Sequence, residues 1–334
     1  MKRTWTLLLA LCVLISVSAC SGGSLTHRRR VAMICDSRMD DGGWGEACYH
    51  GMVKAAGDRG WTFDCTELVP PDGYYEAIRT WCEEGVDLVY VPGNQYIEAT
   101  LRAAEEYPEI SFALLNGNEG VLKEAKNRNI HCLMPNTRQI GWIAGALAGL
   151  MSRTGKIAFI GGISLDTTIQ KYESFVEAAQ YVAQQEGRRV EALPCVYAGG
   201  YEDQEKGVQL ARSLMEQGAD VFFGDASAVD TGARQAIDAV NEERGEAIVF
   251  DIAQPADLLG LNPCIIGSQV TDNSALLSAA MEAVEHDSLG GEMIYGTLQN
   301  HALAAGGLSE LVPPETQEKY LEYLQQMEDG TFME

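Results

Sequence analysis

The chain has 334 residues, which suits two lobes of about 150 residues each and excludes a peptide or a disulfide-stabilised mini-protein. Hydrophobic residues make up 46% and charged residues 22%, so the chain can bury cores and lacks the composition of a disordered protein. The 48 acidic residues outnumber the 24 basic ones and give a formal net charge of -24, which repels a polyanion and argues against nucleic acid as a partner.

The first 30 residues predict export and lipid anchoring. Residues 1–19 have the three parts of a signal peptide: basic residues at positions 2 and 3, an apolar run over 7–17, and small residues before Cys20. The apolar run is too short to span a bilayer. Residues 17–20 resemble a bacterial lipobox, so we expect Cys20 to carry lipid and residues 20–30 to form a flexible tether on the outer side of the cell membrane. The alternative is an ordinary secreted protein whose cleavage site contains a cysteine.

Seven cysteines remain once Cys12 of the signal peptide and Cys20 are set aside, and an odd number leaves at least one thiol without an intramolecular partner. No pair has the spacing C-x-x-C, and no group of Cys and His approaches the spacing of zinc ligands. The sequence therefore predicts no metal site and no cofactor. We expect small buried thiols in preference to a disulfide framework.

From residue 31 onward, short β-rich apolar runs alternate with longer segments of helical period, which is typical of a parallel sheet with crossover helices. A first doubly wound lobe is predicted from strands at 31–36, 62–68, 88–91, 112–116 and 129–134. The helix predicted over 137–151 lies near a crossover between lobes. A second lobe of the same kind is predicted from strands at 156–160, 190–195, 221–223, 248–251 and 265–266. A ligand usually binds in the cleft between two such lobes.

Several sequence blocks, in this order, resemble the basic membrane protein family of ABC-transporter substrate-binding lipoproteins, whose best understood members are purine nucleoside receptors. These blocks are 31–36, 40–44 with Gly51, 105–116, 138–148, 154–162, 198–207, 218–223 and 249–251. The resemblance implies a type I periplasmic-binding-protein fold: α/β, with two doubly wound lobes joined by a hinge of three crossovers. We expect residues 31–135 plus about 252–285 in the N-terminal lobe and residues 136–251 plus about 286–334 in the C-terminal lobe.

Candidate ligand contacts follow the predicted strands of the first lobe. Asp36, Asn94 and Asn116 come at the ends of three strands and would meet at one edge of a parallel sheet, although each residue type is also common in turns. Trp44 stands where the family places a base-stacking Phe, so the resemblance implies stacking on a ligand ring, against the alternative of a buried Trp at a helix start. Gly45 replaces the asparagine that follows this Phe in the family.

The resemblance also implies contacts in the second half of the chain. Asp251 matches the family aspartate that accepts from ribose hydroxyls, and Thr271 stands in place of a ribose-reading lysine. Tyr172 and Tyr201 could supply an opposing ring wall, and Ser268 and Gln269 follow a late strand. The glycine-rich loop of the family's second lobe is replaced by residues 225–232, which include Asp230. Two base- or sugar-reading groups of the family are thus missing and acids are added, which weakens a purine assignment and favours another nucleoside, a modified base or a more cationic ligand.

These observations predict a membrane-anchored solute-binding protein that delivers a nucleoside-like ligand to the permease and ATPase of an ABC importer, and that works as a monomer. A lipoprotein that senses a nucleoside or sugar for a receptor or regulator is the alternative. An enzyme is not expected, because the five histidines are scattered and no nucleophile elbow, P-loop or HExxH pattern occurs.

Overall fold

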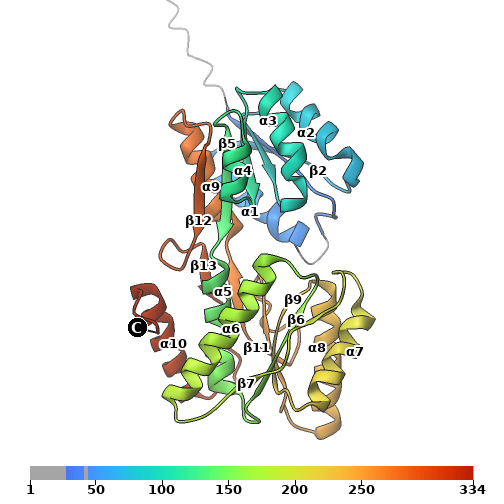
Figure 1. Ribbon diagram of the computed structural model, residues 1–334, viewed down its shortest axis with the longest axis vertical. Coiled ribbons are helices and arrows are strands. Elements are labelled where there is room, and N and C mark those ends of the chain that lie inside the picture. The colour runs from blue at the N-terminus through green and yellow to red at the C-terminus, as the bar shows by residue number, and fades with distance from the viewer. Residues whose placement is uncertain (1–27, 41–43, 334) are drawn as a thin grey trace, which may run out of the picture.

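The computed structural model describes residues 28–40 and 44–333, and it divides them into two α/β lobes arranged one above the other (Figure 1). The predicted signal peptide, Cys20 and most of the predicted tether lie outside the described residues. The seven described cysteines form no disulfide with one another, and five of them are buried.

The first lobe contains a parallel sheet with the strand order β12-β5-β4-β3-β1-β2. Its strands are β1 (Arg30–Ile34), β2 (Thr62–Thr66), β3 (Leu88–Val91), β4 (Ser111–Leu115), β5 (Ile130–Pro135) and β12 (Glu292–Gly296). One face packs against α1 (Trp44–Arg59) and α9 (Asn273–Glu285). The other packs against α2 (Tyr74–Glu83), α3 (Ile97–Glu106) and α4 (Glu119–Glu124), and two 3-10 turns, η1 (Pro71–Gly73) and η2 (Asn94–Tyr96), precede α2 and α3.

The second lobe repeats this winding with the order β13-β11-β10-β9-β6-β7, and β8 also pairs with β6. Its strands are β6 (Lys156–Gly161), β7 (Glu191–Ala192), β8 (Val196–Tyr197), β9 (Val221–Asp225), β10 (Phe250–Ala253), β11 (Ile265–Thr271) and β13 (Leu303–Ala305). Among the described strands of this sheet, only β13 runs antiparallel to its neighbour. Its helices are α5 (Thr137–Met151), α6 (Asp166–Gln185) and α10 (Pro314–Asp329) on one face, and α7 (Gln204–Glu216) and α8 (Ala228–Arg244) on the other. The predicted pair of doubly wound lobes is confirmed.

The sheets divide the chain differently from the expected lobe boundaries. Strands β10 and β11, at the two ends of 250–271, belong to the second sheet, and only α9 and β12 return to the first. The predicted strand at 265–266 is in fact seven residues long, because it pairs with both β10 and β13 before it reaches the crossover. An apolar run of two residues could not show which sheet it joins.

The chain crosses between the lobes three times: from β5 to α5, from β11 to α9, and from β12 to β13. Backbone bonds join these crossovers, since Asn136 N donates to Gly296 O and Asp272 N donates to Ala302 O, each at 2.8 Å. The side chain of Asn136 caps α5 and that of Asp272 caps α9, so each helix begins directly at its crossover. The three connections therefore form one hydrogen-bonded hinge.

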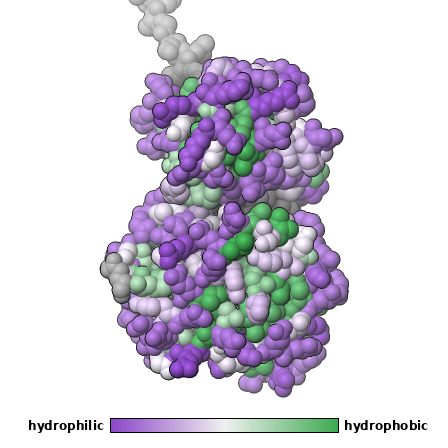
Figure 2. Space-filling model, viewed as in Figure 1, coloured by the Kyte–Doolittle hydropathy of each residue, from purple (hydrophilic) through white to green (hydrophobic). Residues whose placement is uncertain are grey.

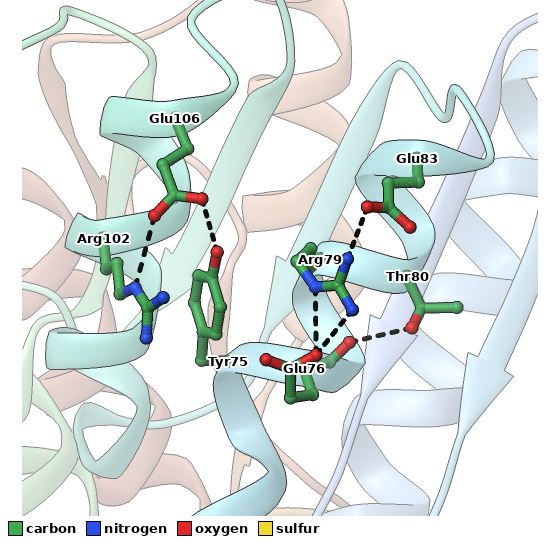
Figure 3. A network of polar contacts seen from close by, with 7 residues as sticks. All are labelled: Tyr75, Glu76, Arg79, Thr80, Glu83, Arg102 and Glu106. Atoms are coloured by element: carbon green, nitrogen blue, oxygen red, sulfur yellow. Dashed lines mark hydrogen bonds and ion pairs between the residues drawn. The ribbon is translucent and has the colours of Figure 1, made fainter.

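The outer helices α2 and α3 of the first lobe are joined by a surface network (Figure 3). The guanidinium carbon of Arg102 lies 3.4 Å from the centre of the Tyr75 ring, and Glu106 accepts from both residues. Along α2, Arg79 donates to Glu76 and Glu83. Exposed ion pairs of this kind contribute little to stability, so the network reflects helix neighbours on an outer face.

Candidate ligand-binding site

The carboxyl edges of the two sheets face each other across the hinge. Strand β5 ends at Pro135 and the chain passes directly into the second lobe, whereas β11 ends at Thr271 and the chain passes directly into the first. Because parallel strands end at the same edge of a sheet, the segments that follow β1, β3 and β4 face those that follow β6, β9 and β10. Figure 2 shows the molecule narrowing at this level.

Asp36 and Trp44 lie together at the edge of the first sheet. The Trp44 indole nitrogen donates to the carbonyl of Pro92, 2.7 Å away, which fixes the ring beside the end of β3. Tyr74 Oη and Gln95 Nε2 each donate to Asp36 Oδ2 at 3.0 Å. Burial, together with the carboxyl group of Asp36, raises the pKa of the Tyr74 hydroxyl to about 12. Asp36 is exposed and held in position, so it can accept from a ligand.

The other first-lobe candidates reach the same edge. Asn94 is exposed at the start of η2, three residues after the end of β3, and Asn116 is half-buried directly after β4. The backbone of Asn116 has φ +62, a left-handed conformation that Asn tolerates better than most residues. Gly45 is buried in the first turn of α1 and has no side chain that could contact a ligand.

A polar cluster that the sequence analysis did not select lies at the edge of the second sheet. Lys171 Nζ of α6 donates to Asp225 Oδ1 at 2.8 Å and to Gln254 Oε1 at 3.3 Å. Thr168 Oγ1 donates to Asp225 Oδ2 at 2.9 Å. Asp225 ends β9 and Gln254 follows β10, so three elements converge at this edge. Lys171 was missed because a lysine on an amphipathic helix is typical of a solvent face, but Gln254 could have been found as the polar residue after a strand.

Two tyrosines lie against the glycines that end β6. A side chain at Gly161 would meet the Tyr197 ring at 2.8 Å, and one at Gly162 would overlap the Tyr201 ring. Burial, together with the charge of Asp225, raises the pKa of the Tyr201 hydroxyl to about 12, so this ring is neutral at physiological pH. Glycine is required at both positions because the tyrosine rings leave no room for a Cβ atom.

Two of the predicted second-lobe contacts point into the lobe instead. Asp251 is the second residue of β10, not its last, and Arg234 Nε donates to its Oδ2 at 2.7 Å in a buried ion pair. Tyr172 donates to the carbonyl of Leu193 and packs its ring against Phe159. In this structure neither side chain faces the first lobe, because the strand containing Asp251 begins two residues later than predicted and Tyr172 lies on the core side of α6.

The remaining predicted residues have structural partners. Asp230 is buried at the start of α8 and accepts from the backbone N–H of Ala226 at 2.8 Å. Ser268 Oγ accepts from Leu258 N, and the Gln269 side chain donates to Val270 O. Thr271 N donates to Pro255 O where β11 enters the hinge. The last three residues shape the crossover and its loop.

Neither a metal nor a membrane-spanning helix is indicated within residues 28–40 and 44–333. No group of three or more His, Cys, Asp or Glu side chains there could hold a metal ion. No helix in the same residues is long and apolar enough to cross a bilayer.

The two lobes and their hinge define a periplasmic-binding-protein fold. A solved solute-binding protein of an ABC transporter system from Conexibacter woesei superposes with a TM-score of 0.73 at 19% identity, covering 90% of this chain and 97% of that one. A solved transcriptional activator of the comK gene from Bacillus halodurans gives a TM-score of 0.75 at 22% identity, with 91% and 100% covered.

The chain belongs to the Bmp family, described as ABC transporter substrate-binding protein PnrA-like, whose model matches residues 28–326. This confirms the predicted family, whose members are solute-binding proteins and not enzymes. A Lactococcus lactis relative, named an ABC transporter nucleoside-binding protein, is 26% identical over 68% of this chain but over only 64% of its own length. A Bacillus subtilis relative, named transcriptional activator protein med, is 22% identical over 92% of this chain and 91% of its own.

Proposed function

We propose that this protein is the extracytoplasmic substrate-binding component of an ABC importer and that it binds a nucleoside-like small molecule between its lobes. The main support for this proposal is that polar and aromatic side chains lie at two sheet edges, which face each other across one hinge. The name of the Lactococcus lactis relative supports a nucleoside as the ligand.

The geometry suits such a ligand. The Trp44 indole offers a flat apolar wall for a base, and Asp36 offers a carboxylate acceptor for base or sugar N–H and O–H groups. The Lys171–Asp225 pair adds a donor and an acceptor on the other lobe. A ligand that contacts both lobes favours the conformation in which the two sheet edges approach each other.

A thermal-shift screen of residues 21–334 with nucleosides, bases and pentoses tests the ligand. A ligand at 100 times its dissociation constant stabilises the fold by about 2.7 kcal/mol. We expect a nucleoside to raise the melting temperature, and we expect Trp44→Ala to weaken its binding by about 1–3 kcal/mol, the usual value of stacking on a base. Trp81→Ala, on the outer face of the same lobe, is the matched control. A folded protein that no nucleoside stabilises would contradict the nucleoside assignment.

We also propose that Cys20 carries the lipid anchor. Metabolic labelling with a fatty acid should tag the wild-type protein and keep it in the membrane fraction. Cys20→Ser should lose the label and leave the membrane, whereas Cys195→Ser should keep both. Equal labelling of the wild type and Cys20→Ser would exclude lipidation at this residue.

A sensor is the second candidate, since a relative matched over nine tenths of both chains is named a transcriptional activator. A transporter component should co-purify with a permease and an ATPase from detergent-solubilised membranes, and its deletion should abolish ligand uptake. Normal uptake after deletion, together with altered transcription on ligand addition, would favour the sensor.

A further inference from the structure

The pair Lys171–Asp225 is a partly buried ion pair at the edge of the second sheet that faces the first lobe. Its side chains are 14% and 24% exposed, and they come from α6 and the last residue of β9. Burying an ion pair removes water from both charges, and this cost offsets most of the attraction between them. Stability therefore does not by itself explain a charged pair at this edge.

The hydrogen bonds within this cluster leave one donor and one acceptor available for a ligand. Lys171 Nζ has three donors, of which two go to Asp225 and Gln254. Asp225 Oδ1 accepts from Lys171 and from Gln254 Nε2, whereas Oδ2 accepts from Thr168 alone among the described residues. One ammonium N–H and one side of Oδ2 therefore have capacity for a ligand.

The backbone beside the pair supports a ligand site. Ser227, two residues after Asp225, has φ +53 and ψ -114, a conformation that side-chain-bearing residues rarely adopt. Strain of this kind clusters at ligand sites, where the surrounding structure holds it. Here the segment is held on both sides, since Gly162 N donates to Asp225 O and Ala228 N donates to Tyr201 O.

The chemistry of the two available groups defines the part of the ligand that they accept. One hydroxyl can donate to Asp225 Oδ2 while its neighbour accepts from Lys171 Nζ, so a pair of adjacent hydroxyls satisfies both. The pair gives no net attraction for a charged group, because an anionic group is attracted to Lys171 but repelled by Asp225, and a cationic group the reverse. We infer that Lys171 and Asp225, positioned by Thr168 and Gln254, bind the vicinal diol of an uncharged sugar ring. This inference rests on the proposed solute-binding function.

This assignment differs from the one that the resemblance implies. Asp251 is closed off by Arg234 in a buried ion pair, and the Thr271 side chain bonds within its own strand to Gln269. The diol is therefore read from α6 and the end of β9, and not from the start of β10 and the hinge end of β11.

Calorimetric titration with the four common ribonucleosides and their 2′,3′-dideoxy forms tests the inference. The wild type should bind a ribonucleoside at least tenfold more tightly than its dideoxy form. In Lys171→Met and Asp225→Asn this ratio should fall toward one, through loss of ribonucleoside affinity, while dideoxy affinity changes less than threefold. Lys319→Met removes an ion pair with Glu186 in the same lobe and should leave the ratio unchanged.

Circular dichroism and melting temperature establish that each variant is folded. A folded Lys171→Met and a folded Asp225→Asn that both keep the wild-type ratio would overturn the diol subsite while leaving nucleoside binding intact. If no nucleoside binds the wild type, the same comparison is made with D-ribose and 2-deoxy-D-ribose. A preference for D-ribose that Lys171→Met abolishes would support the subsite although the nucleoside assignment fails, and no binding of either sugar would overturn both.

Discussion

Asp230 is a single carboxyl group whose burial makes the stability of the second lobe depend on pH. Burial raises the pKa of Asp230 to about 7, although Arg234 and the Ala226 N–H oppose the shift. An unfolded chain releases this proton near pH 4, so the folded state binds more protons between about pH 4 and pH 7. The contribution of Asp230 to folding therefore falls as pH rises through that window.

We expect Asp230→Asn to remove this dependence. The amide keeps an oxygen for Ala226 N and has no charge to desolvate. Relative to the wild type, the variant should gain free energy of unfolding as pH rises from 4 to 7, by at most about 1.4 kcal/mol per pH unit. Urea unfolding at half-unit steps of pH measures this. Parallel pH profiles for the two proteins would show that Asp230 in the folded state has the ordinary pKa of an aspartate.

At the scale of elements, α5 and α6 pack through glycines rather than through interlocking large side chains. A Cβ atom at Gly145 would lie 2.8 Å from Ala178 Cβ and would overlap the carbonyl oxygen of Phe175. Gly141 and Gly149 meet α6 in the same way, so the two helix backbones approach closely along their length.

Gly145→Ala should therefore destabilise the protein by about 1–3 kcal/mol, because the helices must separate. The matched control is Gly57→Ala in α1, where a Cβ atom meets nothing within 4 Å. That change should stabilise by about 0.5–1 kcal/mol, the usual gain of alanine over glycine inside a helix. Chemical denaturation of both variants measures the difference. A Gly145→Ala protein as stable as Gly57→Ala would mean that the two helices can move apart at little cost.

The sequence predicts individual helices and strands, but it does not predict contacts between residues of different elements. The apolar period predicted α5 with the bounds found, and Asp36, Asn94 and Asn116 could be proposed for the first-lobe edge because they come within three residues of the ends of buried strands. Asp251 was misplaced because a two-residue shift moves a side chain from the strand end into the interior. Lys171 could not be found, since its role depends on Asp225 and Gln254, which come from other elements.

At the scale of the whole molecule, one buried glutamine joins the crossovers to the C-terminal helix. Gln139 Oε1 in α5 accepts from Leu298 N at 2.9 Å, and Gln139 Nε2 donates to Gln299 Oε1 at 3.0 Å. Gln299 in turn donates to the carbonyls of Met327 and Glu328 at the end of α10. The first and third crossovers are thus tied to each other and to the far end of the chain.

Gln139→Ala should loosen this hinge by leaving the buried N–H of Leu298 without its acceptor, at a cost of about 1–3 kcal/mol. Hydrogen exchange should show faster exchange at Leu298 and the rest of the third crossover, because the amide protection there depends on the local opening free energy. Gln299→Ala removes the exposed half of the same chain of bonds, and the N–H of Leu298 keeps its acceptor in that variant. Its stability loss should be smaller, and Leu298 should stay protected. Equal protection of Leu298 in the wild type and in Gln139→Ala would show that the crossovers are held by their backbone bonds alone.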